Sequence, residues 1–449
     1  MDYVDRLAHF AAAIRYPQLP ASVRDRAELV LLDTLGVIGF GAQDPVMVQM
    51  RRSLVPGNWP CRLPGTHHTA DPARAAFFNA ASCTVAQIDE GYRPSRGHPA
   101  IHVIPAVLAV AEESGAQGDD VMSSIVAGYE VGARLGVAFG SLHEGVHPHG
   151  TWGMVAAAAA VAKLFGGAAP EIVAAMDGAA ALALVPPART MVEGTTIHHY
   201  FAGVGARTAV EVGYGVRDGV TTTRGTLQNH YAPRCSTSPD FRRLLDGIED
   251  GATRYLILDN YFKFHPVCAH TLAAIDAIDA IKSQRESRRP VSSISVRTYA
   301  EAAKLSEASP QTALAAKFSL PYVVAARWLD SMGSILFDRQ LDDDRLCELM
   351  SKVTVIHDPG LDARYPAARP AIVTVQFQDG TTLTEEREYH YGDGGRLARS
   401  AVIDKFHRLL SPVLGVERAK ELEHQVRRLP AAKSIDRMMK QTVRPLAAT

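Results

Sequence analysis

The sequence predicts a large all-helical domain combined with a smaller α+β domain, and three observations support this fold class. Residues up to about 260 mostly follow the apolar period of helices. Beyond about residue 285, segments appear in which apolar and polar side chains alternate, as in half-buried strands. The length of 449 residues exceeds the roughly 100–200 residues of an ordinary domain and favours two domains. We therefore expect a helical domain over 1–260, completed by 396–449, and an α+β lid domain over 261–395.

Helices are expected wherever apolar residues recur every third or fourth position. The segment VRDRAELVLLDTLGVIGFGA has this period, and IPAVLAVAEESG carries Pro105 in its first turns and ends at a glycine. The run from Thr151 to Phe165 is so rich in alanine, and so apolar on all sides, that it predicts a helix buried on most faces. A helical period returns after the glycines at 392–395, and this tail is expected to dock onto the helical domain.

Strands are expected in three segments of the later part of the chain. These are SISVRTY, SKVTVIHD and AIVTVQFQDGTTLTEE, each with alternating apolar positions. The dipeptide Asp379-Gly380 inside the third segment is typical of a hairpin turn. A helical stretch over 309–349 separates the first two strands. Strands mixed with helices in this way predict a small α+β domain.

Composition excludes several classes of protein. The 47 basic residues face 48 acidic ones, so no excess of positive charge would attract nucleic acid. Five scattered cysteines without a CxxC pair argue against a disulfide framework and fit a reducing compartment. The start of the chain lacks the features of a signal peptide, and the most apolar stretches, 152–165 and 178–187, are shorter than the ~20 residues of a membrane span. We expect a soluble cytoplasmic protein that binds neither membrane nor nucleic acid.

The first candidate site is a Gly- and Pro-rich loop that leads into a helix. It holds two carboxylates, two arginines and a histidine: Asp89, Glu90, Arg93, Arg96 and His98. The arginines could clamp a carboxylate with paired hydrogen bonds, and the amides of a helix start favour anions. Either acidic residue could act as a base if its surroundings raise its pKa. The alternative is a solvated loop with a surface salt bridge.

Three further clusters contain histidine. In GVHPHGT, His147 could transfer a proton or bind a carboxylate, or could cap the next helix; no ligand spacing for zinc accompanies it. His198 lies in a His-His-aromatic run that is equally consistent with a partly buried helix face. In KFHPVCAH, Cys268 lies near His265, but without a known motif a packed structural cysteine is favoured over a nucleophile. Phosphate loops, GxGxxG after a strand, GxSxG and HExxH are all missing, which disfavours nucleotide, serine-hydrolase and zinc-protease chemistry.

The order of these clusters resembles the 2-methylcitrate dehydratase family (MmgE/PrpD), which also includes cis-aconitate decarboxylase and iminodisuccinate epimerase. The resemblance rests on segments such as LLDTLGVIGFGA, GHPAIHVIPAVLAVAEESGAQG, GVHPHGTWGMVAAAAAVAKLFG, KFHPVCAHTLAAIDAI, AKFSLPYVVA and VTVQFQDGTTL. It implies a homodimer with its active site in a cleft between the two domains. It also implies small di- or tricarboxylate substrates, no metal or organic cofactor, and removal of a proton next to a carboxylate.

The resemblance also suggests which residues act. The catalytic residues expected from it are Asp89, His98, His147, Lys263 and Tyr322. The expected substrate-binding residues are Arg93, Arg96, His198, His265 and Cys268, and no metal ligands are expected. The sequence departs from the common family pattern at Gln87, Gly91, His198 and Cys268.

The leading prediction is thus a cofactor-independent lyase of the dehydratase type. Its substrate would be a hydroxy di- or tricarboxylate such as 2-methylcitrate. The alternatives are an epimerase or a decarboxylase that uses the same proton abstraction, and a catalytically silent family member that only binds a ligand.

Overall fold

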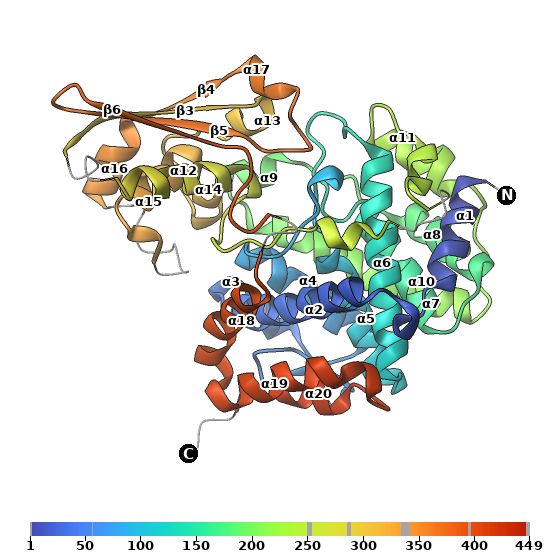
Figure 1. Ribbon diagram of the computed structural model, residues 1–449. Helices are drawn as coiled ribbons and strands as arrows, with labels where there is room; N and C mark the ends of the chain where they lie inside the picture. Colours follow the sequence, from blue (N-terminus) through green and yellow to red (C-terminus); the bar gives the residue numbers. More distant parts are fainter. Residues whose placement is uncertain are drawn as a thin grey trace. The chain divides into compact units, whose positions relative to one another are not determined.

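The computed structural model describes residues 2–55, 57–248, 254–284, 289–333, 341, 343–393 and 397–445 (Figure 1). The chain divides into two compact units. Unit 1 comprises 1–187, 199–262 and 394–449, and unit 2 comprises 188–198 and 263–393. The segment 188–198 lies inside the helical domain expected over 1–260, but in the structure it groups with unit 2. Each unit is described by itself below.

Unit 1 is built mainly from helices, as its apolar period predicts. They are α1 (Tyr3–Ala13), α2 (Ala21–Gly41), α3 (Pro45–Met50), α4 (Pro72–Ala86), α5 (Ala100–Ser114), α6 (Gly118–Phe139), α7 (Trp152–Leu164), α8 (Ala169–Leu182), α10 (Tyr200–Arg217), α11 (Ala232–Cys235), α18 (Arg399–Leu414), α19 (Val416–Arg428) and α20 (Asp436–Gln441). One small correction to the all-helical description is a two-stranded antiparallel pair, β1 (Cys61–Arg62) with β2 (Thr69–Ala70).

Helix α7 lies at the centre of this unit. Every residue from Trp152 to Lys163 is buried, and α7 packs against α5, α6, α8 and α10. This explains why the segment is apolar all round, because a helix that contacts neighbours on every side has no face to keep polar. Far along the chain, α18 packs against α2, and Figure 1 shows this red helix beside the blue one. The last part of the sequence therefore belongs structurally with the first.

Unit 2 contains a mixed four-stranded sheet. Its strands are β3 (Val291–Thr298), β4 (Val353–His357), β5 (Ala371–Phe377) and β6 (Thr382–Arg387), in the order β4-β3-β5-β6. Strands β3 and β4 are parallel, whereas β5 is antiparallel to both β3 and β6. In β5, alternate residues from Ala371 to Phe377 are buried, so the predicted alternation is confirmed. The predicted hairpin turn joins β5 to β6, with Gly380 at φ +85°.

Helices cover one face of this sheet. Helix α12 (Leu272–Lys282) packs against β5 and β6, and α15 (Leu320–Trp328) packs against α12 and β4. The remaining helices of the unit are α9 (Arg189–Val192), α13 (Ala300–Ala303), α14 (Ala313–Lys317), α16 (Asp344–Ser351) and α17 (Pro359–Asp362). The helical stretch expected over 309–349 is thus divided into α14, α15 and α16, and its portion at 334–340 and 342 lies outside the described residues.

Two expectations from composition can be checked here. All five cysteines are free thiols, as their scattered spacing predicts. Within the residues described above, no single helix is both long and apolar enough to cross a membrane; α2 passes such a test only together with 45–53, and that pair is bent by 74°.

Candidate active site

A carboxylate and a histidine of unit 1 form a close pair in the loop between α4 and α5. Nδ1 of His98 lies 2.7 Å from an oxygen of Asp89 and 2.6 Å from the main-chain oxygen of Glu90. Both partners are acceptors, so Nδ1 carries a proton, and in the neutral ring the lone pair then lies on Nε2. Asp89 is buried and the His98 side chain is 15% exposed. The geometry therefore holds one imidazole in the tautomer that can accept a proton.

The neighbouring Glu90 has a structural task. Its Oε1 accepts the amide of Ala100 at 3.0 Å, and its Oε2 accepts the hydroxyl of Tyr129 at 2.8 Å. Burial is the largest effect on this carboxyl and raises its pKa to about 8. The Ala100 amide at the start of α5 is consequently occupied by the protein's own carboxyl group, and the expectation that this loop binds a substrate anion stays a prediction.

The loop itself is anchored from both sides. Gln87 ends α4 with a left-handed φ of +52°, and its side-chain amide donates to the Thr84 carbonyl at 2.8 Å. The ammonium group of Lys405, on α18, donates to the Ile88 carbonyl at 2.7 Å and lies 2.5 Å from Asp33 on α2. These contacts fix the main chain immediately before Asp89, so the pair with His98 is built on a rigid support.

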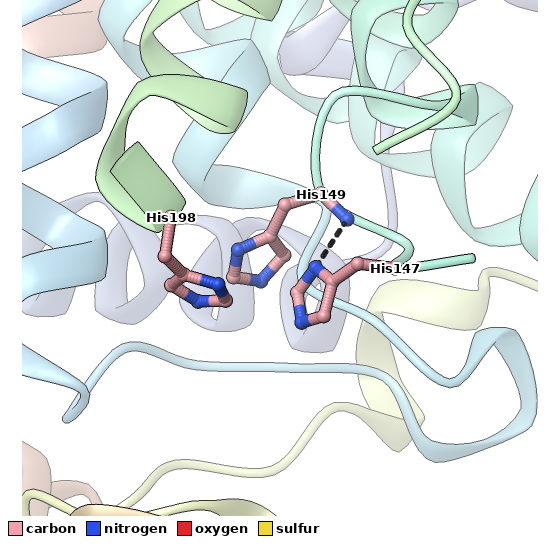
Figure 2. Close-up of side chains that lie close together, drawn as sticks. All are labelled: His147, His149 and His198. Carbon is pink, nitrogen blue, oxygen red and sulfur yellow. Dashed lines mark hydrogen bonds between the residues drawn. The ribbon is translucent and has the colours of Figure 1, made fainter. Parts of the chain in front are cut away.

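The loop before α7 supplies two more histidines to this region. The amide of His149 donates to Nδ1 of His147 at 3.2 Å, as the dashed line in Figure 2 shows. Because an amide can only donate, Nδ1 of His147 is unprotonated, and the neutral ring carries its proton on Nε2. The His149 ring stands edge-to-face to both His147, at 4.5 Å between centroids, and His98, at 5.3 Å. Unit 1 thus gathers three imidazoles, one set to accept a proton and one set to donate.

The two arginines of the loop are half-buried. Arg93 opens a short 3-10 turn, Arg93–Ser95, which Arg96 ends in a left-handed conformation at φ +55°. The guanidinium of Arg96 donates to the hydroxyl of Ser141 at 2.8 Å. The expectation that Arg93 and Arg96 bind a substrate carboxylate stays a prediction.

Unit 2 holds the other residues that the sequence singled out. Lys263 and Tyr322 are almost wholly buried, the latter on α15, where the Ser319 hydroxyl caps its amide. His198 is buried too, with Nδ1 3.3 Å from the Thr190 hydroxyl and its ring near Phe318.

Two of the predicted binding residues are close in sequence within unit 2. Cys268 is buried, and its amide donates to the Lys317 carbonyl at 2.9 Å. His265 is half-buried, and one donor atom each from His265, Asp276 and Asp279 lie within 4.8 Å of one another. Asp279 accepts two hydrogen bonds from the guanidinium of Arg327, so this member of the group already has a cationic partner.

Sequence comparisons bear on the identity of this arrangement. Residues 5–233 match the MmgE/PrpD N-terminal domain, and residues 265–430 match the MmgE/PrpD C-terminal domain. The chain belongs to the MmgE/PrpD family. A cis-aconitate decarboxylase of Aspergillus terreus is 24% identical, with 94% of this chain and 91% of that protein covered. A cis-aconitate decarboxylase-like protein, oryM, of Aspergillus oryzae is 24% identical as well, with 96% and 95% covered. The family resemblance predicted from the ordered segments is therefore confirmed.

Sequence reasoning on this MmgE/PrpD protein missed several residues around the three imidazoles. The sequence pattern singled out His147 but not His149 in GVHPHGT, and it offered Glu90 only as a possible base. His102 and Lys405 were not singled out at all. A signal did exist for His102, because it is the one polar side chain in the otherwise apolar stretch AIHVIPAVLAV. Lys405 offered no local signal, since its partners lie more than three hundred residues earlier.

Proposed function

We propose that this protein is a lyase that moves a proton at the carbon next to a carboxylate of a small di- or tricarboxylate. The observation that carries the proposal is the Asp89–His98 pair beside the His147–His149 loop. Removal of such a proton requires a base whose lone pair is held ready, together with a donor for the oxygen that gains charge. These are the two tautomers that the hydrogen bonds in unit 1 select.

The roles follow from the tautomers. Nε2 of His98 takes the proton from carbon, and the resulting imidazolium is stabilised by Asp89, as in other carboxylate–histidine pairs. Nε2–H of His147 donates to the oxygen that becomes more negative. In a dehydration, the electrons of the broken C–H bond form the double bond, and the hydroxyl leaves as water with the proton from His147. Arg93 is proposed to hold a substrate carboxylate.

Two lyase reactions fit this machinery. The sequence favoured dehydration of a hydroxy-acid such as 2-methylcitrate. One relative is named a cis-aconitate decarboxylase and another a cis-aconitate decarboxylase-like protein, and each is aligned over more than nine-tenths of this chain. These relatives favour decarboxylation of a tricarboxylate. In that reaction the C–C bond to the leaving carboxylate breaks, carbon dioxide departs and its bonding electrons stay as a carbanion. A histidine that has first taken a proton from solvent then donates it to the carbanion. An epimerase would use the same base without a leaving group.

Family resemblance adds further parts to the proposal. It assigns Lys263 and Tyr322 of unit 2 to the same reaction, and it implies a homodimer that needs no cofactor. Lys263→Ala and Tyr322→Phe test the residue assignments, because each should lower kcat. Sedimentation of the purified protein tests the dimer.

The decisive experiment is proton NMR in deuterated water with citrate, 2-methylcitrate, cis-aconitate, malate, tartrate and an amino-dicarboxylate. A new vinyl signal from a hydroxy-acid would establish dehydration, and loss of labelled carbon dioxide from cis-aconitate would establish decarboxylation. Deuterium entering a substrate without either product would establish an isomerase. If no compound exchanges or reacts, the lyase proposal is wrong for this substrate class and a silent binding protein becomes the better account.

Variants connect the activity to the pair. We expect His98→Gln to lower kcat by about 10²–10⁴-fold, the usual range for a general base. Asp89→Asn should cost about 10–100-fold, since the Glu90 carbonyl still holds Nδ1–H. His9→Gln is the matched control, because His9 is an exposed histidine of the same unit. Full activity in His98→Gln would overturn the assignment.

A further inference from the structure

One histidine near the candidate site takes no part in the chemistry proposed above. His102 lies in the first turn of α5, and only 1% of its surface is exposed. Two glycines on other helices make room for its ring. A Cβ at Gly153 of α7 would come within 2.4 Å of Nδ1, and one at Gly205 of α10 within 3.2 Å of Cδ2. Three helices therefore meet around a single buried imidazole.

Both nitrogens of this ring contact main-chain groups. The amide of Gly150 donates to Nε2 at 3.0 Å, and Nδ1 lies 3.3 Å from the carbonyl oxygen of His98. An amide can only donate and a carbonyl can only accept, so the ring is neutral, with its proton on Nδ1. Burial is the largest effect on the group and lowers its pKa to about 4.

These two hydrogen bonds join the segments that carry the proposed base and the proposed acid. The hydrogen bond from Nδ1 is made to the main-chain carbonyl of His98 itself. The hydrogen bond at Nε2 is made to the amide of Gly150, which directly follows the His147–His149 segment in the chain. A hydrocarbon side chain of the same size could fill the space, but it would leave a buried amide and a buried carbonyl without these partners, which is unfavourable. The site thus selects an imidazole for its two-sided hydrogen bonding.

We propose that His102 is a positioning residue, whose two hydrogen bonds set the placement of His98 relative to the loop of His147 and His149. This inference rests on the proposed function, because it assigns the residue a purpose in proton transfer. It predicts that loss of His102 lowers kcat and leaves KM nearly unchanged, since the residue acts on the alignment of the two imidazoles and touches no substrate.

Two conservative variants separate the two hydrogen bonds. Asparagine places an amide nitrogen at the position of Nδ1, so His102→Asn keeps the donor to His98 and loses the acceptor for Gly150. Glutamine places an oxygen at the position of Nε2, so His102→Gln keeps the acceptor and loses the donor. His102→Leu loses both. We expect kcat to fall by about tenfold in each single-bond variant and by about 10²-fold in the leucine variant, with KM within about threefold.

The matched control is Val103→Ala, which removes buried packing from the same helix without touching these hydrogen bonds. It should lower the melting temperature yet retain kcat. If Val103→Ala loses as much kcat as His102→Asn, the effect is general destabilisation and the proposal fails. It fails also if His102→Leu retains full kcat.

A spectroscopic measurement tests the inference even without turnover. In protein labelled with ¹⁵N at its 17 histidines, the signal that disappears in His102→Gln identifies the residue. We expect the Nδ1–H tautomer and no titration of that signal between pH 5.5 and 8. The signals of His98 and His147 should shift in His102→Leu and stay in place in Val103→Ala. An Nε2–H tautomer of His102, or unmoved His98 and His147 signals in His102→Leu, would overturn the positioning role. A wild-type protein that is inactive on every carboxylate tested would overturn the proposed function alone.

Discussion

The buried carboxyl of Glu90 makes the stability of unit 1 depend on pH in a direction that can be worked out. Its pKa is raised to about 8 in the folded protein, mainly by burial, from an ordinary value of 4.5. Between these values the folded state keeps a proton that the unfolded state releases. The free energy of unfolding must therefore fall as the pH rises through this window, and the stabilisation is fully present only below about pH 4.5.

The substitution Glu90→Gln removes this dependence. Glutamine mimics the neutral acid. Its oxygen can accept the Ala100 amide, and its nitrogen can donate to the Tyr129 hydroxyl oxygen, as a protonated Oε2 would with the direction of the Tyr129 hydrogen bond reversed. Each pH unit inside the window is worth about 1.4 kcal/mol. From pH 5.5 to 7.5, the free energy of unfolding of the parent protein should fall by about 2–3 kcal/mol more than that of the variant.

Urea unfolding at several pH values measures this difference. Trp152 of unit 1 is buried and becomes the only tryptophan once Trp59 and Trp328 are replaced by phenylalanine. Its fluorescence then reports on unit 1 alone. Glu144→Gln is the control, since Glu144 is an exposed glutamate of the same unit and its variant should follow the parent curve. If the curves of the parent and Glu90→Gln run parallel from pH 5.5 to 7.5, the buried carboxyl is ionised throughout and the reasoning is wrong.

Three other substitutions have clear expected outcomes. Lys405→Met should lower the free energy of unfolding of unit 1 in urea by about 3–5 kcal/mol, because it leaves the buried Asp33 without its cation. Adding Asp33→Leu should recover most of that loss. Gly97→Ala should lower the free energy of unfolding of unit 1 by about 1–3 kcal/mol and change the fluorescence of Trp152, since the added Cβ would come within 2.4 Å of the Trp152 ring. An unchanged emission spectrum would contradict this packing. Gly380→Ala should lower the stability of unit 2 by roughly 1–2 kcal/mol in thermal unfolding because φ is +85° there, with no effect on kcat.

The parts of the fold that depend on neighbours in sequence were predictable. Helix α7 and strand β5 follow from their own patterns, because apolar residues at a fixed period describe which face is buried. The loop before α5 and the histidine loop before α7 were also recognised, since each combines turn residues with titratable groups just ahead of a helix.

What the sequence could not supply is the choice of partners inside these loops. Asp89 and Glu90 are adjacent, yet one pairs with His98 and the other reaches back to Ala100 and Tyr129. Both side chains are carboxylic acids of similar length, so only the path of the main chain separates their roles. The role of His102 was hidden for a related reason, because a histidine within an apolar helix gives no indication of which carbonyl and amide it meets.

The anchoring of Ile88 by Lys405 has a consequence for how the protein is made. These residues are 317 positions apart, and the whole of unit 2 is synthesised between them. During translation the N-terminal helices emerge first and can begin to pack, but the segment preceding Asp89 lacks its ammonium partner until α18 has left the ribosome. The loop that carries Asp89 therefore stays without one of its anchors in a nascent chain until the whole of unit 2 has been synthesised.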